Sequence, residues 1–311
     1  MILLALMSEF LYGRVINEFP IRNGYNEKIS GRVIGWLSGG VASAIACKLA
    51  IDHYGDAVEL VFCDTQAEHP DTHRFLQDFC RALGRTYKTI KSPRFDNPEQ
   101  VWRHYKGLNF AHGAPCSTVL KREVRVNFQE INTDFSQVFG FDYEKKEERR
   151  AANLLGNYPE INPIFPLIAK QVSREKVFKM LEDMGVKRPV TYDHFFNNNC
   201  IGSFDKIENL KNGNGFGCIQ GGIGYWQKVK KLFSWKFDYM ASIEHELSNE
   251  KGEPVTICKD QRKATNGNKL FLKPHPSFPD IESIDVIKGR QPVTAFECNG
   301  FCSTSTQLEL F

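Results

Sequence analysis

Residues 32–43 read RVIGWLSGGVAS, and this stretch decides the fold. Its first six residues are an apolar run that ends at glycines, which is typical of a short buried strand. Helix-forming residues follow over 42–54, with apolar positions at helical spacing. Glycines let the chain turn tightly, and a helix start presents free N–H groups and a partial positive charge. The stretch therefore predicts a strand, a glycine turn and a helix, with phosphate or pyrophosphate on the turn; a tight turn without any ligand is the alternative.

The same alternation continues along the chain. Residues 57–62 read as another buried strand and residues 87–90 as a third strand, and a helix over about 69–83 separates them. This order predicts the fold class: α/β, a parallel twisted sheet covered by helices on both faces. Beyond it we expect a fourth strand at 137–140 and helices at 116–128, 144–155, 173–184 and 225–247, the third of them capped by Ser173.

The overall composition limits which kinds of protein this chain can be. The chain has 311 residues, 41% of them hydrophobic and 25% charged, with a net charge of +3 and a pI near 8.3. These values are ordinary for a soluble globular protein and too mild to argue for nucleic acid. Residues 1–7 are apolar but lack a basic leading segment and are followed by Glu9, so we expect a cytoplasmic protein without a membrane span. We expect an N-terminal extension (1–29), a nucleotide-binding α/β domain (30–190) and a cysteine-containing helical and irregular region (191–311).

The nine cysteines are an odd number, which favours reduced thiols over a disulfide framework. Cys47, Cys63 and Cys80 lie in apolar patterns and are predicted to be core residues. The glycine turn is neither G-x-x-x-x-G-K-[ST] nor G-x-G-x-x-G, which argues against a Walker-type NTPase and against a nicotinamide or flavin site.

Several motifs carry a family resemblance. Ser38-Gly39-Gly40-x-x-Ser43 resembles the PP-loop of the adenine nucleotide α-hydrolase-like superfamily, whose fold is Rossmann-like. Within it, the motifs resemble the phosphoadenosine phosphosulfate (PAPS) reductase family, in particular its uncharacterised members, many of them from phages. The matching segments are Cys63–Thr72, Pro115–Lys121, Val138–Phe141 with Glu147 and Arg150, Asn197–Gly202, and Cys218–Trp226. The resemblance spans about residues 30 to 250.

The resemblance implies a nucleotide site for PAPS or ATP. Its phosphates would lie on the turn formed by Ser38, Gly39, Gly40, Val41, Ala42 and Ser43. The segment with Asp64 and Thr65 follows the second strand, where Asp64 would bind a metal or ribose, or serve only as a helix cap. Lys121 and Arg122 would neutralise phosphate or sulfate oxygens, or lie on a solvated helix face.

Glu147 and Arg150 are expected to be a helical charge pair, and the resemblance adds them to the site. Relatives that cleave ATP carry Asp where this chain has Ala42, which weakens a prediction of Mg-dependent cleavage, although Asp64 or Glu68 could hold Mg.

The loop cysteines suit metal or redox chemistry. Cys116, Cys200 and Cys218 are candidate ligands for an iron–sulfur cluster or zinc, as in some PP-loop tRNA thiolases, and unligated thiols are the alternative. Relatives bring the last two together as Cys-x-x-Cys, whereas here residues 203–217 separate them. Cys298 partly resembles the nucleophile in the tail of PAPS reductases, with Cys302 as the resolving thiol; a fourth metal ligand is the competing interpretation.

Three functions follow. The first is reduction of PAPS by the Cys298 thiolate, with a thioredoxin-like reductant. The second is an ATP pyrophosphatase that adenylylates a nucleic-acid base or small molecule for sulfur or nitrogen transfer. The third is a nucleotide-binding sensor without catalysis. Residues 221–231 combine aromatic and basic groups, but we favour packing of Trp226, Val229 and Phe233 over nucleic-acid binding. The sequence carries no signal for an oligomeric state.

Overall fold

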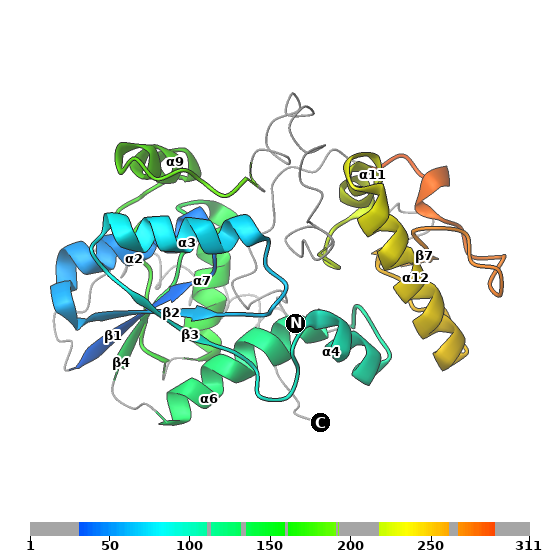
Figure 1. Ribbon diagram of the computed structural model, residues 1–311, viewed down its shortest axis with the longest axis horizontal. Helices are drawn as coiled ribbons and strands as arrows, with labels where there is room; N and C mark the ends of the chain where they lie inside the picture. Colours follow the sequence, from blue (N-terminus) through cyan, green and yellow to red (C-terminus); the bar gives the residue numbers. More distant parts are fainter. Residues whose placement is uncertain are drawn as a thin grey trace, which may run out of the picture.

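The computed structural model describes residues 31–110, 113–131, 135–158, 161–190, 192, 218–260 and 267–289. Its centre is a five-stranded sheet in the order β3-β2-β1-β4-β5, with every neighbouring pair parallel (Figure 1). The strands are β1 (Arg32–Leu37), β2 (Val58–Cys63), β3 (Tyr87–Ile90), β4 (Phe135–Val138) and β5 (Pro163–Ile164). The predicted α/β class with a parallel sheet is therefore confirmed.

Helices cover both faces of the sheet because side chains of a strand alternate between its faces. Val33 and Leu37 of β1 lie in one core cluster with α2 (Val41–Tyr54), α3 (Pro70–Ala82) and α9 (Arg174–Asp183). Ile34 and Trp36 lie in the other cluster, with α6 (Glu123–Ile131) and α7 (Lys145–Asn157). Figure 1 shows α2 and α3 above the sheet.

The strand order creates a switch point between β1 and β4. The chain moves outward from β1 to β3 and then returns to the opposite side of β1 for β4 and β5. Loops on either side of a switch point diverge, and ligands of open α/β sheets bind there, beyond the carboxyl ends of the strands. The fourth strand ends at Val138 rather than continuing to the predicted 140, because Gly140 leaves the sheet and packs against the start of α2.

A second core follows in the chain. It contains α11 (Ile223–Leu232), α12 (Ser234–Lys251) and the antiparallel pair β6 (Cys258–Lys259) and β7 (Lys269–Leu270). Trp102, from α4 (Pro98–Tyr105), and Leu108 belong to it as well. The remaining elements are α5 (Pro115–Ser117), a π-helical turn (Thr118–Arg122), α8 (Pro166–Ala169) and the 3-10 turns Gly55–Ala57 and Ile284–Val286.

The single helix predicted over 225–247 is wrong. The chain breaks at Phe233, whose backbone has φ −141° and ψ 60°, so that two helices pack against each other in place of one. Burial of the Phe233 ring, together with Trp226 and Val229, accounts for the break, and no proline or glycine marks it in the sequence. The predicted inward packing of these three residues is confirmed. None of the helices in the described ranges is long and apolar enough to cross a bilayer.

Candidate functional site

The glycine turn after β1 is held by two serines. Ser43 Oγ accepts hydrogen bonds from the N–H of Ser38 at 3.0 Å and from Ser38 Oγ at 2.9 Å, and it donates to the carbonyl of Gly40 at 2.9 Å. Gly39 has φ +82°, a conformation that favours glycine. These bonds fold the turn into a closed loop at the carboxyl end of β1, as the sequence predicts.

Helix α2 starts at this loop, and its first backbone N–H groups have no hydrogen-bond partner within the helix. The first helical hydrogen bond runs from Ala44 N–H to Gly40 O at 3.2 Å, so the N–H groups of Ala42 and Ser43 have no helical carbonyl to meet. The Val41 N–H donates to the hydroxyl of Tyr192 at 3.1 Å. Backbone N–H groups at a helix start are a binding site for phosphate or sulfate oxygens.

The end of β4 closes the other side of the loop. A Cβ on Gly140 would lie 2.4 Å from Ser43 Cα and 2.5 Å from Ser43 N. Only a residue without a side chain fits there, which accounts for glycine at this position. Gly140 therefore sets how closely β4 approaches the start of α2.

A pocket opens beside this loop, with an empty volume of about 520 Å³ that includes open solvent. We call it the anion pocket. It is lined by Trp36, Leu37, Ser38, Ser43, Cys63, Lys121, Arg122, Arg125, Phe139 and Gly140. The lining has three cationic side chains and no carboxylate among the described residues, so it suits an anion.

The three cations come from one helical segment with a π-helical turn. An α-helix separates successive side chains by about 100°, which would point Lys121 and Arg122 in different directions. The turn Thr118–Arg122 has more residues per turn, so these two side chains come closer together. Arg125 lies one turn further along, on the same face. Of the two alternatives for Lys121 and Arg122, a solvated helix face is not what the structure shows, since both line the anion pocket.

Arg125 and Cys63 both line the pocket. Arg125 is 5% exposed, and its guanidinium lies 5.7 Å from the centre of the Phe139 ring. Burial raises the pKa of Cys63 to about 12, although the charges of Lys121 and Arg125 act in the opposite direction. Cys63 is thus a protonated thiol near neutral pH. Cys47 and Cys80 are buried in the first core, as the sequence predicts. Cys63, also predicted to be a core residue, is half-buried: it packs against the core cluster on the other face of the sheet and lines the pocket as well.

Glu68 connects the β2 end to the cations. Its carboxylate accepts from the N–H and hydroxyl of Thr65 at 3.2 and 2.8 Å and from Ala67 N–H at 3.2 Å. It lies 3.7 Å from Lys121 Nζ, and burial raises its pKa. Asp64 accepts from the Gln66 N–H at 2.8 Å, and the cap of α3 is His69. Asp64 is therefore a turn residue beside the pocket rather than the cap of that helix.

Glu147 and Arg150 form the predicted helical charge pair. Their closest atoms are 2.8 Å apart, and the Arg150 guanidinium lies 5.1 Å from the centre of the Phe141 ring. Neither side chain lines the anion pocket.

The candidate ligand cysteines are only partly described. Cys116 packs against the second core, which also contains Ile219, the neighbour of Cys218. Cys218 donates its N–H to the hydroxyl of Tyr225 at 3.3 Å. Cys200, Cys298, Cys302 and the insertion 203–217 lie outside the described residues. Within the described ranges, no three His, Cys, Asp or Glu side chains are grouped to hold a metal ion.

Seven residues at the site were not assigned to it from the sequence: Tyr192 and, in the pocket lining, Trp36, Leu37, Cys63, Arg125, Phe139 and Gly140. A signal existed for Arg125, because it lies four residues after Lys121 on a predicted helix. Tyr192 lies about 150 residues from the loop that it contacts, and no local pattern connects the two.

No protein-family model matches the chain, and no curated protein is similar to it. Among solved structures, the phosphate complex of the PAPS reductase from Candida auris is 15% identical, covers 52% of this chain and 77% of its own, and has a TM-score of 0.37. The U34-tRNA thiolase NcsA from Methanococcus maripaludis, solved with its 4Fe–4S cluster, is 14% identical, covers 90% and 91%, and has a TM-score of 0.37. The chain is thus similar, at a distance, to a PAPS reductase and to a tRNA thiolase.

Proposed function

We propose that this chain binds the anionic part of an adenine nucleotide in the anion pocket. The observation that supports this most directly is the convergence of the Ser38–Ser43 loop with Lys121, Arg122 and Arg125 around one pocket, whose lining has no carboxylate among the described residues. A phosphate or sulfate group there would accept hydrogen bonds from the loop amides and from these cationic side chains.

The leading reaction is reduction of a sulfonucleotide. The Cys298 thiolate attacks the sulfur of PAPS, an S–S bond forms, and the S–O bond to the phosphate breaks. Adenosine 3′,5′-bisphosphate leaves with the bonding electron pair, and the sulfonate stays on Cys298. A thioredoxin-like dithiol then attacks the Cys298 sulfur, releases sulfite, and is itself oxidised to a disulfide. Lys121, Arg122 and Arg125 would hold the departing anion.

The donor set is a poor match for magnesium-dependent cleavage of ATP. Mg²⁺ takes oxygen ligands, usually one or two carboxylates. Ala42 supplies only a methyl group, and Glu68 is already bonded to Thr65 and paired with Lys121. Asp64 accepts from the Gln66 N–H and lies beside the pocket, outside its lining. This favours the sulfonucleotide reaction over the pyrophosphatase, and it agrees with three protein cations supplying the positive charge.

One observation supports the second function. The segments with Cys116 and Cys218 pack against the same core, which is the arrangement that a shared thiolate site needs. Together with Cys200 they would hold an iron–sulfur cluster or zinc, and the enzyme would transfer sulfur or nitrogen to an acceptor. Anaerobic purification with iron and zinc analysis tests this: Cys116→Ser should lose the metal, and Cys80→Ala, a change in the first core, should keep it.

Calorimetry with PAPS and ATP tests the binding site itself. Arg122→Gln should weaken nucleotide binding by roughly ten- to a hundredfold, because hydrogen bonds to charged groups contribute about 1.5–3 kcal/mol. Arg149→Gln, on an exposed position of α7, is the matched control. If the protein releases sulfite from PAPS with thioredoxin, and Cys298→Ser does not, the reductase is supported. If it releases pyrophosphate from ATP, and Ser43→Ala does not, the pyrophosphatase is supported. Binding without turnover favours the sensor, and absence of binding at millimolar nucleotide overturns the proposal.

A further inference from the structure

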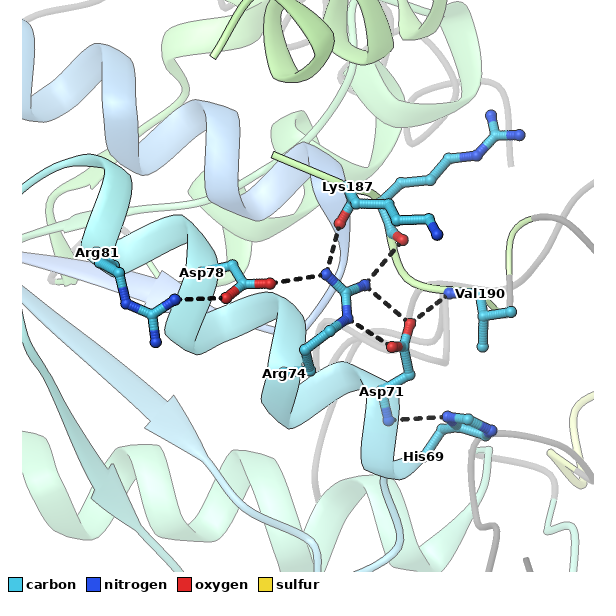
Figure 2. A network of polar contacts seen from close by, with 8 residues as sticks. His69, Asp71, Arg74, Asp78, Arg81, Lys187 and Val190 are labelled. Carbon is cyan, nitrogen blue, oxygen red and sulfur yellow. Dashed lines mark hydrogen bonds and ion pairs between the residues drawn. The ribbon is translucent and has the colours of Figure 1, made fainter. Parts of the chain in front are cut away.

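Helix α3 holds a separate chain segment through one carboxylate and one guanidinium (Figure 2). The Arg74 guanidinium meets the Asp71 carboxylate at 2.6 and 3.0 Å and donates to the carbonyls of Lys187 and Arg188 at 3.1 and 3.0 Å. The same carboxylate accepts from the Val190 N–H at 2.7 Å. We call Asp71 and Arg74 the α3 clamp, because together they fix the backbone of residues 187–190.

The clamped segment leads directly to the start of α2. The Tyr192 N–H donates to Pro189 O at 3.1 Å, and the Tyr192 hydroxyl accepts from the Val41 N–H at 3.1 Å. The Tyr192 ring is 4% exposed and packs edge-on against Phe178, with ring centres 5.5 Å apart. A side chain held this closely has a defined position relative to the loop.

The first turn of α3 also touches the loop. A Cβ on Gly39 would lie 2.4 Å from Thr72 Cγ2, so the Gly39 backbone rests on the residue that follows Asp71. The loop therefore has two kinds of neighbour. Ser38 and Ser43 line the anion pocket, whereas Gly39 and Val41 lie against α3 and Tyr192, the two elements that the clamp joins.

We propose that Asp71 and Arg74 are positioning residues for the anion, acting through Tyr192 and Thr72 on the Ser38–Ser43 loop. This inference rests on the proposed nucleotide site. With the Val41 N–H bonded to Tyr192 and the Gly39 backbone resting on Thr72, the loop that carries the Ala42 and Ser43 amides is held in a fixed arrangement. A loop that is already ordered binds more tightly, because less conformational entropy is lost on binding.

The test compares Arg74→Gln, Arg74→Lys and Tyr192→Phe with Arg81→Gln. Arg81 is the matched control, since it lies on the same helix and its side chain is 75% exposed. In Figure 2 it bonds to Asp78, which also accepts from Arg74 Nη1 at 3.0 Å, and not to residues 187–190. Calorimetry measures the affinity for PAPS and for ATP, denaturant unfolding measures stability, and amide hydrogen exchange follows Val41.

Tyr192→Phe and Arg74→Gln should each weaken binding of the nucleotide by about three- to tenfold, which corresponds to loss of one ordinary hydrogen bond. Hydrogen exchange of the Val41 amide should be faster in Tyr192→Phe and in Arg74→Gln than in the wild type. Arg74→Lys should bind the nucleotide more tightly than Arg74→Gln does, and Arg81→Gln should match the wild type in affinity and exchange. Tyr192→Phe keeps the test valid if Arg74→Gln does not fold. Wild-type or tighter binding by a folded Tyr192→Phe protein overturns the inference, whereas a wild type that binds neither nucleotide overturns the proposed function.

Discussion

Replacing Gly140 by alanine should push the end of β4 into the Ser38–Ser43 loop. The new Cβ would lie 2.4 Å from Ser43 Cα, 2.5 Å from Ser43 N and 2.8 Å from the Ala42 carbonyl carbon. Ordinary carbon contacts are about 3.5–4.0 Å, so roughly 1 Å of movement is required. All three atoms belong to the backbone, and none can swing aside as a side chain would.

The expected cost has two parts. Overpacking of this kind lowers the free energy of unfolding by about 1–3 kcal/mol. Displacing the Ser43 amide by about 1 Å should also weaken nucleotide binding at least about tenfold, because donors at a binding site act over short distances. Urea unfolding and calorimetry measure the two effects on the same preparation.

Gly156→Ala is the control for this change. No atom lies within 4 Å of its added Cβ, and Gly156 lies inside α7. Alanine is a better helix former than glycine by about 1 kcal/mol, so this variant should be as stable as the wild type or slightly more. If Gly140→Ala matched Gly156→Ala in both stability and affinity, the contact between β4 and the loop would be refuted.

Three further predictions concern charge and pH. Burial raises the pKa of Glu244 from 4.5 to about 8, so the folded state keeps a proton that the unfolded state loses. The free energy of unfolding should therefore fall as the pH rises from about 5 to 8. Glu244→Gln should remove this pH dependence, measured by urea unfolding. Cys63, with a pKa of about 12, should react with iodoacetamide at pH 8 about a thousandfold more slowly than an exposed thiol, and fast labelling followed by mass spectrometry would contradict its burial. Chelation with EDTA should change nucleotide affinity by less than about twofold in calorimetry, because the pocket lining has no carboxylate to hold Mg²⁺; a large loss would refute this.

The fold of the first half follows from local sequence patterns. Apolar runs of six residues specify β1 and β2, and Ser173 caps α9 by accepting from the Lys176 N–H. The Ser38–Ser43 loop is also predictable, since glycine and serine spacing fixes its hydrogen bonds. These features depend on neighbours within a few residues, which a sequence displays directly.

Features that depend on distant packing were not predictable in this way. The break at Phe233 arises because its ring is buried in the second core, and its residue type does not signal a helix end. Cys63 has the apolar setting of a core residue, but the switch point opens the pocket beside it. The contact between Tyr192 and Val41 joins residues about 150 positions apart in the chain, so no local pattern displays it.

The helical segment that supplies the pocket cations has its base in the other half of the protein. Ala114 and Cys116 pack with the second core, and Lys121, within two turns of them, lines the anion pocket. The segment that carries the pocket cations therefore starts in one core and ends at the pocket beside the other. A truncated fragment, or a chimera joined near residue 190, should lose anion affinity together with the half that is removed. A ligand that moves one half should also change the conformation of the other half through this segment.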